Sequence, residues 1–430
     1  MTDKHADFID VANLRVGHYV FLDVGWMGHP FALNSFRVAT QSQIDTIRSL
    51  GIERIRYSVA QSVFPEDEAA AEKHVEGSNT SADVLDEAAD EVQQRQQRRQ
   101  QLATQRASLQ RCEGQFSDAA RGYKQILDTM YLQPELARAR STEIIDEMIR
   151  QMGSADEETY VRLLSEKAGE KTSLHSINVA IISLLLGKAM DCDAAQMHDI
   201  GVGALLHDIG KIDLPDRLRW ADRELSSAEM AAYREHVTKG ATLAKKVGLA
   251  SGAQRIVAHH HERHNGSGYP AHLQGDSIDL PSRIVSLVNE YDNLCNPGNP
   301  ALSVTPHEAL SLIYAQQKSL FDTRTLAVFV RLMGVYPPGS VVELSTGQFA
   351  MVVSVNSARP LRPHVVVHDT AVPASEALIF DLEQHPDVGI RRSLKPQHLP
   401  RAAFDYLSPR KRLCYFFERS REFESLEIRP

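Results

Sequence analysis

The 430-residue chain is poor in cysteine, in long apolar runs and in positive charge. Its four cysteines are scattered and form no CxxC pair, which argues against a disulfide framework and against a thiolate zinc site. The longest apolar run, Val179 to Leu186, is too short to span a bilayer. The formal net charge of −9 argues against a dedicated DNA or RNA binder, although a small anionic ligand would need only local positive charge.

The start of the chain, MTDKHADFID, lacks the apolar core of a signal peptide. Hydrophobic residues make up 43% of the chain and charged residues 24%, which is ordinary for a folded cytosolic protein. We therefore expect a soluble, cytoplasmic protein without a membrane span, and its length predicts two or three domains.

The first part of the chain, residues 1–64, is predicted to be a small α/β module. The segments HYVFLDV, FRVAT and RIRYSV have the pattern of strands, and SQIDTIRSLGI has helical spacing that ends at Gly51. Residues 65–110 are predicted to be a linker followed by a polar helix. That helix is interpreted as a solvated connection, with a dimerising coiled coil or an anion-binding arm as alternatives. Residues 111–154 are predicted to be connecting helices.

The remainder separates into a helical block and a β block. Residues 155–335 have a helical pattern almost throughout, and Ser226 and Glu229 stand in capping-box spacing, which places His236 inside a helix. Residues 336–430 begin with an alternating segment around a Thr-Gly turn, followed by PHVVVH. The predicted fold class is therefore multidomain: an all-α domain flanked by an N-terminal α/β module and a C-terminal, mainly β module.

Potential metal ligands occur at five places along the helical block. They are His175, His207-Asp208, His236, His260-His261 and Asn289. Helices that face one another in a bundle can assemble a metal site, and imidazole with carboxylate suits iron, manganese, cobalt or zinc better than calcium or magnesium. His175 or His236 taken alone would more often be a surface residue or a hydrogen-bonded core residue than a ligand. His259 is not predicted to be a ligand, because three neighbouring side chains cannot all point one way.

His207 and Asp208 are adjacent, so on a regular helix their side chains would diverge by about 100°. They can serve one site near a helix end, or where one carboxylate bridges two ions, and Gly210 fits a helix that ends there. Lys211 follows directly and could neutralise a substrate phosphate.

Together these motifs resemble the HD-GYP domain of the HD phosphohydrolase superfamily. The resemblance rests on HDIGK, HHER and GSGYP, which occur with an upstream HS and an intervening H…G in the family's order, over about residues 155–335. The first 64 residues resemble a domain of unknown function that precedes HD-GYP, and YPPGSVVELSTGQ resembles a β extension that follows it.

The resemblance implies an all-α domain with two divalent metal ions, iron or manganese, that hydrolyses cyclic di-GMP to pGpG or GMP. It implies metal ligation by His175, His207, Asp208, His236, His260, His261 and Asn289, with Asp208 in the bridging position. It assigns Lys211, with Asp208, to catalysis. It further places Arg263, Gly268, Tyr269 and Pro270 at the substrate groove, where the glycine loop also contacts diguanylate cyclase domains. A homodimer is an additional hypothesis.

Three departures from the family leave alternatives open. The family has Asp where this chain has Asn289, and adjacent Glu290 could substitute as the ligand. Lys171 replaces a glutamate ligand, so a third metal is not expected. A basic segment after the last motif is absent, since LCNPGNPALSVTPHEAL contains no Lys or Arg. The alternatives are a module that binds a nucleotide or partner without turnover, and a phosphohydrolase of another nucleotide.

Overall fold

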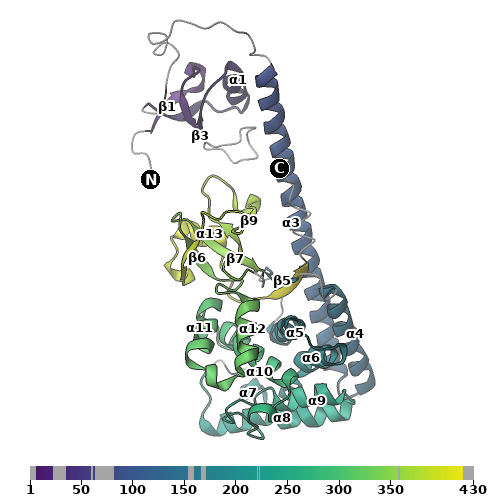
Figure 1. Cartoon of the computed structure of the whole chain (residues 1–430). Coiled ribbons are helices and arrows are strands. Elements are labelled where there is room, and N and C mark those ends of the chain that lie inside the picture. Colours follow the sequence, from purple (N-terminus) through teal and green to yellow (C-terminus); the bar gives the residue numbers. More distant parts are fainter. Residues whose placement is uncertain are drawn as a thin grey trace. The chain divides into compact units, whose positions relative to one another are not determined.

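The computed structural model describes residues 6–22, 35–59, 62, 82–153, 159–165, 171–219, 221, 223–356 and 359–419 (Figure 1). The chain divides into two compact units. The first comprises residues 1–104 with 369–378, and the second comprises residues 105–368 with 379–430. Within the described residues, no helix is both long enough and apolar enough to cross a membrane.

The first unit contains a small antiparallel sheet and one short helix. The sheet has the order β1-β4-β2-β3, and its strands are β1 (Ala6–Asp10), β2 (Tyr19–Phe21), β3 (Ser35–Arg37) and β4 (Arg54–Ser58). Helix α1 (Gln41–Ser49) begins at a capping box and buries Ile44 and Ile47 against the sheet's core. Strand β1 was not predicted. Part of the predicted HYVFLDV strand and most of the predicted linker lie outside the described residues.

One long helix, α3 (Ala82–Thr129), replaces the separate helices expected on either side of residue 110. The second half of α3 buries Phe116, Tyr123 and Ile126 in the main core. Apolar residues recur there with helical spacing, whereas the sequence of the first half is polar. Helix α4 (Pro134–Met152) starts anew with proline in its first turn, where a missing backbone N–H costs nothing.

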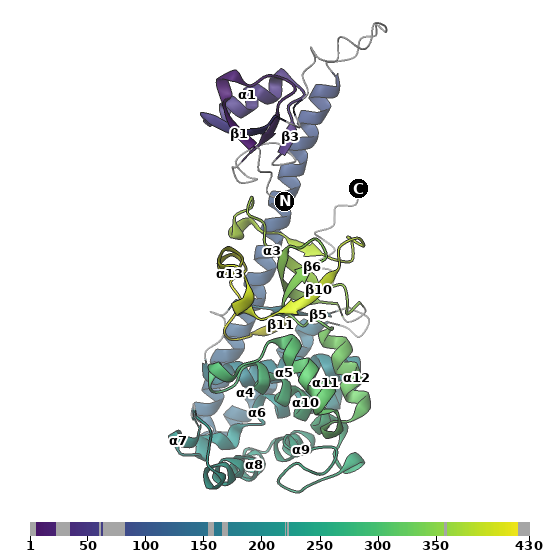
Figure 2. The ribbon, with the colours of Figure 1, turned by 90° about the vertical axis from the view of Figure 1, so that its left-hand side faces the viewer.

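The helices of the second unit surround α5 (Lys171–Ala189), which is apolar on nearly all sides and contacts α6, α10 and α12. Figures 1 and 2 both show α8 and α9 on the side of this helical layer that faces away from the sheet. The other helices are α6 (Ala194–Leu206), α7 (Asp216–Arg219), α8 (Ser227–Val247), α9 (Ser251–His259), α10 (Leu280–Cys295), α11 (Pro306–Gln316) and α12 (Thr323–Met333).

A seven-stranded antiparallel sheet covers one end of these helices, and the short helix α13 (Arg401–Leu407) accompanies it. Along β7, Met351 and Val353 join the main helical core, whereas Ala350 and Val352 join a second core on the opposite face. The main path of the sheet has the order β10-β6-β7-β5-β11, and β8 pairs with β7 and β9. Its strands are β5 (Thr159–Leu163), β6 (Val341–Leu344), β7 (Phe349–Val355), β8 (His364–Val367), β9 (Ile379–Asp381), β10 (Ile390–Leu394) and β11 (Tyr415–Arg419).

The predicted hairpin around the Thr-Gly turn is confirmed as β6 and β7, and PHVVVH contains β8. Strand β5 differs from the helical pattern expected over residues 155–335. It is a five-residue segment whose role depends on partners far along the chain, because it pairs with β7 and β11. Such long-range pairing leaves only a weak local signal.

Candidate metal centre

Five helices and one short 3-10 turn bring the predicted ligands to one place in the helical layer. His175 lies on α5, His207 is the residue that ends α6, and Asp208 opens the short 3-10 turn that follows. His236 lies on α8, whose predicted capping box at Ser226 and Glu229 is present.

The remaining ligand candidates come from α9 and α10. His260 ends α9 and His261 follows it, while Asn289 lies on α10 and is 1% exposed. His259, which was not predicted to be a ligand, belongs to neither of the two potential metal-binding groups found among the described residues.

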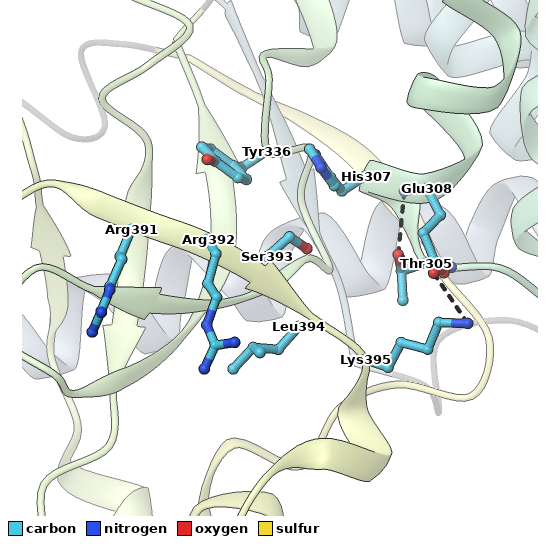
Figure 3. A pocket seen from close by; sticks show the side chains of 9 residues that line it. All are labelled: Thr305, His307, Glu308, Tyr336, Arg391, Arg392, Ser393, Leu394 and Lys395. Carbon is cyan, nitrogen blue, oxygen red and sulfur yellow. Dashed lines mark hydrogen bonds and ion pairs between the residues drawn. The ribbon is translucent and has the colours of Figure 1, made fainter. Parts of the chain in front are cut away.

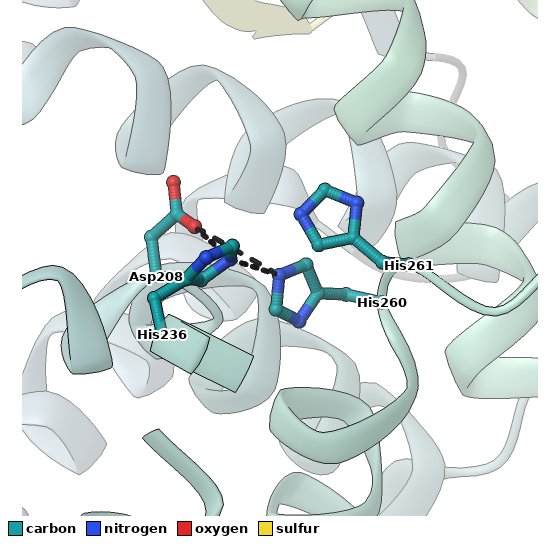
Figure 4. A group of neighbouring side chains, drawn as sticks. All are labelled: Asp208, His236, His260 and His261. Carbon is teal, nitrogen blue, oxygen red and sulfur yellow. Dashed lines mark hydrogen bonds and ion pairs between the residues drawn. The ribbon is translucent and has the colours of Figure 1, made fainter. Parts of the chain in front are cut away.

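Those two groups share Asp208. One consists of His175, His207 and Asp208, and the other of Asp208, His236, His260 and His261 (Figure 4). In each group the ligand atoms lie within 4.8 Å of one another. Oδ2 of Asp208 faces His207 Nε2 at 3.3 Å, whereas Oδ1 faces His236 Nε2 at 3.4 Å. The two oxygens of the Asp208 carboxylate therefore face the two different ligand groups.

Hydrogen bonds to backbone carbonyls, on the side of each ring away from the cluster, fix the orientation of three imidazoles. The Nδ1 atoms of His207, His236 and His260 lie 2.7, 2.7 and 2.9 Å from the carbonyl oxygens of the residues three positions earlier. A carbonyl can only accept, so Nδ1 carries the proton and Nε2 presents a lone pair to the centre. This arrangement of outer hydrogen bonds is typical of metal-ligating histidines.

His175 is oriented by a carboxylate that was not predicted. Asp292, on α10 and fully buried, has its Oδ2 2.7 Å from His175 Nδ1. Its Oδ1 accepts hydrogen bonds from the side-chain amides of Asn178 and Asn296, both at 2.9 Å. Asp292 stands three positions after Asn289, on the same helical face, and this spacing is the signal by which it could have been found.

The cluster fits a cation, because its inner atoms would otherwise face one another without a proton. His175 Nε2 lies 3.2 Å from His207 Nε2 and 3.0 Å from Asn289 Oδ1, and His236 Nε2 lies 3.4 Å from His260 Nε2. Buried lone pairs at these separations are unfavourable unless a positive charge lies between them. Among the described residues, Oδ1 of Asp208 also has no hydrogen-bond partner although it is buried.

The ionisation of the cluster favours metal ligation as well. Burial lowers the pKa of His236 to about 4 and holds the pKa values of His260 and His261 well below the ordinary value, so these rings are neutral at pH 7. Burial alone would raise the pKa of Asp208, but the attraction of Lys211 and the neighbouring imidazoles outweighs it and holds that pKa well below its usual range. Neutral imidazole and ionised carboxylate are the forms that bind metal.

Lys211 lies at the edge of the cluster. Its ammonium is 2.6 Å from Asp208 Oδ2, and its side chain keeps 24% of its surface exposed. Burial alone would lower the pKa of Lys211, but the carboxylate of Asp208 raises it, so the charge is permanent at neutral pH. The ammonium also lies 5.2 Å from the ring centre of Tyr233, a residue of α8 that was not predicted to belong to the site.

The glycine loop folds back onto the turn that carries His260 and His261. The ring of Tyr269 stacks on that of His261 with centres 4.6 Å apart, and a side chain at Gly268 would collide with the backbone of Arg263 and His261. Pro270 follows Tyr269 through a cis peptide bond. Glu262, which was not predicted to have a role, is buried and accepts hydrogen bonds from the N–H groups of Ala271 and Leu273 at 2.6 and 2.9 Å.

Arg263 is engaged inside the protein. Its guanidinium contacts Glu290 at 2.5 Å and Ser286 at 3.1 Å, and it lies over the ring of Phe321. Glu290 also accepts a hydrogen bond from Gln317 at 3.2 Å. Glu290 is thus occupied by partners outside the cluster. The side-chain oxygen of Asn289 accepts a hydrogen bond from Asn293 at 2.8 Å and also faces the cluster, 3.0 Å from His175 Nε2.

Comparison with known proteins agrees with this arrangement. Residues 158–325 match the HD domain, residues 8–140 a domain of unknown function (DUF3391), and residues 341–402 a KOW domain associated with the HD domain. The cyclic di-GMP phosphodiesterase PA4108 of Pseudomonas aeruginosa is 25% identical over 84% of this chain and 85% of its own length.

Two further relatives match shorter parts. The cyclic di-GMP phosphodiesterase response regulator RpfG of Xanthomonas campestris is 30% identical over 53% of this chain and 60% of its own length. The 3'3'-cGAMP-specific phosphodiesterase 1 of Vibrio cholerae is 28% identical over 41% of each chain. The chain therefore contains an HD domain preceded by a DUF3391 domain, and the HDIGK, HHER and GSGYP motifs within its HD domain resemble those of the HD-GYP type.

Proposed function

We propose that this protein is a metal-dependent phosphodiesterase that hydrolyses cyclic di-GMP to pGpG or GMP. The observation that carries the proposal is the pair of ligand groups joined by Asp208, with the outer nitrogen of four histidines already engaged. The names of the relatives support the substrate class.

Two divalent ions, iron or manganese, are the proposed cofactors. His175, His207 and Asn289 would hold one ion, His236, His260 and His261 the other, and Asp208 both. Such ions supply Lewis acidity, which lowers the pKa of bound water and offsets charge on a phosphoryl group. The mixed imidazole, carboxylate and amide set suits these metals better than calcium or magnesium.

The protein's own residues contribute charge and orientation. We assign to Lys211 the role of holding a non-bridging phosphate oxygen, because its ammonium is permanently charged, partly exposed and fixed by Asp208. Tyr269 is proposed to form a wall of the substrate site together with Gly268 and Pro270. A cytoplasmic location, a homodimer and contact of the glycine loop with diguanylate cyclase domains are further parts of the proposal.

One observation favours a second candidate, hydrolysis of a different nucleotide. Arg263 contacts Glu290 and Ser286, and its side chain is only 14% exposed, so it offers few donors to a guanine or phosphate of the substrate. The segment that follows α10 also contains no basic residue before α11. Phosphodiesterase action on 3'3'-cGAMP, the substrate named for one relative, is the most direct version of this alternative.

The test is to purify the protein under low oxygen, count metal ions per chain, and follow cyclic di-GMP and 3'3'-cGAMP by chromatography with Fe²⁺ or Mn²⁺. We expect bound metal and conversion of cyclic di-GMP, both lost in His207→Ala and Asp208→Ala. Neighbouring histidines offer a matched control: His260→Gln should lose metal and activity, and His259→Gln should keep both. A protein that binds no metal contradicts the proposal, and conversion of 3'3'-cGAMP alone favours the second candidate.

A further inference from the structure

A polar cavity lies in the second unit, between the start of α11 and the end of β10. It has a volume of about 370 Å³ and shares no lining residue with the metal cluster (Figure 3). Helix α11 packs against α10, the helix that carries Asn289 and Asp292. The residues that line the cavity are Thr305, His307, Glu308, Tyr336, Arg391, Arg392, Ser393, Leu394 and Lys395.

An irregularity in β10 brings two arginines to the same side. Successive residues of a strand normally face opposite sides of a sheet, yet the pairing of β10 with β6 shifts register between Ile390 and Arg392. Both guanidinium groups consequently reach the same carboxylate, that of Glu343, with Arg391 at 3.1 Å and Arg392 at 2.7 Å. Such bulges characteristically redirect side chains toward functional surfaces.

The cavity has more positive than negative charge. Arg391, Arg392 and Lys395 contribute three cations, and the carboxylates that contact them are those of Glu343 and Glu308. The three cationic side chains are 68%, 63% and 51% exposed. An arginine has five N–H donors, so a single shared carboxylate leaves donors on both guanidinium groups available for a further anion.

An aromatic wall stands beside these charges. The rings of His307 and Tyr336 are stacked, with centres 5.2 Å apart and planes 19° from parallel. His307 Nδ1 donates to the carbonyl of Val335 at 2.8 Å, which fixes the imidazole in this position. Paired arginines and flat rings together are the groups that bind phosphate and a planar base.

We propose that this cavity binds a nucleoside monophosphate, with the phosphate on Arg391, Arg392 and Lys395 and the base against His307 and Tyr336. Small-molecule sites span roughly 300–1,000 Å³, and a cavity near the lower limit accommodates one nucleotide but not a cyclic dinucleotide. The site is separate from the metal cluster, and its existence does not depend on phosphodiesterase activity.

The experiment is calorimetric titration of the metal-loaded full-length protein with GMP and, separately, with inorganic phosphate. We expect GMP to bind more tightly than phosphate. The variant Arg391→Gln/Arg392→Gln should weaken GMP binding by about tenfold or more, because it removes charge-assisted hydrogen bonds. The control Arg121→Gln/Arg150→Gln, which removes equal charge from two exposed arginines of α3 and α4, should leave it unchanged.

Two further variants separate the proposal from a general loss of structure. Glu343→Gln removes the internal anion that competes for both arginines, so GMP binding should tighten by about twofold to fivefold, a gain that misfolding cannot produce. His307→Ala should weaken GMP binding and leave phosphate binding unchanged. The proposal is overturned if the arginine variant binds GMP as tightly as the wild type, if Glu343→Gln does not tighten binding, or if phosphate binds as tightly as GMP.

Discussion

Replacing Asp292 by asparagine should weaken metal binding without unfolding the protein. The side chain keeps its shape, and an amide oxygen at the position of Oδ1 can still accept from Asn178 and Asn296. At the position of Oδ2, however, an amide nitrogen would face His175 Nδ1 across 2.7 Å. Both atoms would then carry protons, so His175 must move its proton from Nδ1 to Nε2 to accept the new hydrogen bond. A protonated Nε2 cannot ligate a metal.

The expected size of the effect follows from the loss of this outer hydrogen bond. Substitutions of such partners typically cost 10- to 100-fold in metal affinity, about 1.4–2.8 kcal/mol. The measurement is competition with a chelator, followed by elemental analysis after dialysis. Thermal unfolding of the metal-free protein serves as the check on folding. Asp279→Asn is the matched control, since Asp279 precedes α10 and contacts Arg255 instead. If Asp292→Asn retains as much metal as the wild type, Asp292 does not set the proton position of His175.

Four other predictions concern the same centre. Asn289→Asp adds an anionic ligand of the same shape, so more metal should survive dialysis and less added ion should be needed for half-maximal activity. If neither the retained metal nor the required ion concentration changes, Asn289 is not a ligand. Lys211→Ala should lower turnover more than metal content, and a variant that loses metal but keeps its activity per metal ion would contradict the phosphate-binding role. Burial lowers the pKa of His236 to about 4 in the folded chain. Between pH 6.5 and pH 4 the unfolded chain therefore binds a proton that the folded chain does not. As a result, the unfolding free energy of the metal-free protein should fall as pH falls. Between pH 7 and pH 5, His236→Gln should remove about 2 kcal/mol of this dependence, which urea unfolding at the two pH values would measure. A pH dependence that the substitution leaves unaltered would contradict the prediction. Glu262→Gln should speed amide hydrogen exchange of Leu273 by about tenfold and leave metal content intact, whereas unchanged exchange would mean that Glu262 does not hold the loop.

The sequence was most informative where one helix end or one short motif determines the geometry. His207 and Asp208 stand at the end of α6, one of the two arrangements that their adjacency allowed, and β6 and β7 form a hairpin around the Thr-Gly turn. The metal binding itself stays a prediction, because proximity of His and Asp side chains does not establish an ion. Lys211 lies beside Asp208 as its position in the motif suggested.

Features that depend on distant partners could not be predicted. The placement of Arg263 at the substrate groove stays a prediction, but the sequence did not indicate that its guanidinium contacts Glu290, 27 residues later in the sequence. Strand β5 exists because β7 and β11 pair with it, and neither partner leaves a local trace in residues 159–163. Asp292 was overlooked because a single carboxylate on a helix has many possible roles, and its role depends on its contact with His175.

The hydrogen bonds of Asp292 also determine when the centre can be completed during synthesis. Asn178, which donates to Asp292, also donates to the carbonyl of Leu413 and accepts from the N–H of Tyr415. Asn296 makes the same link to Leu413. Domains generally fold as they leave the ribosome, N-terminal segments first. Here the helices that carry the ligands emerge long before residues 413–415. A nascent chain can therefore form its helical bundle early, yet the hydrogen bonds that support His175 are completed only when residues 413–415, at the start of β11, have been made.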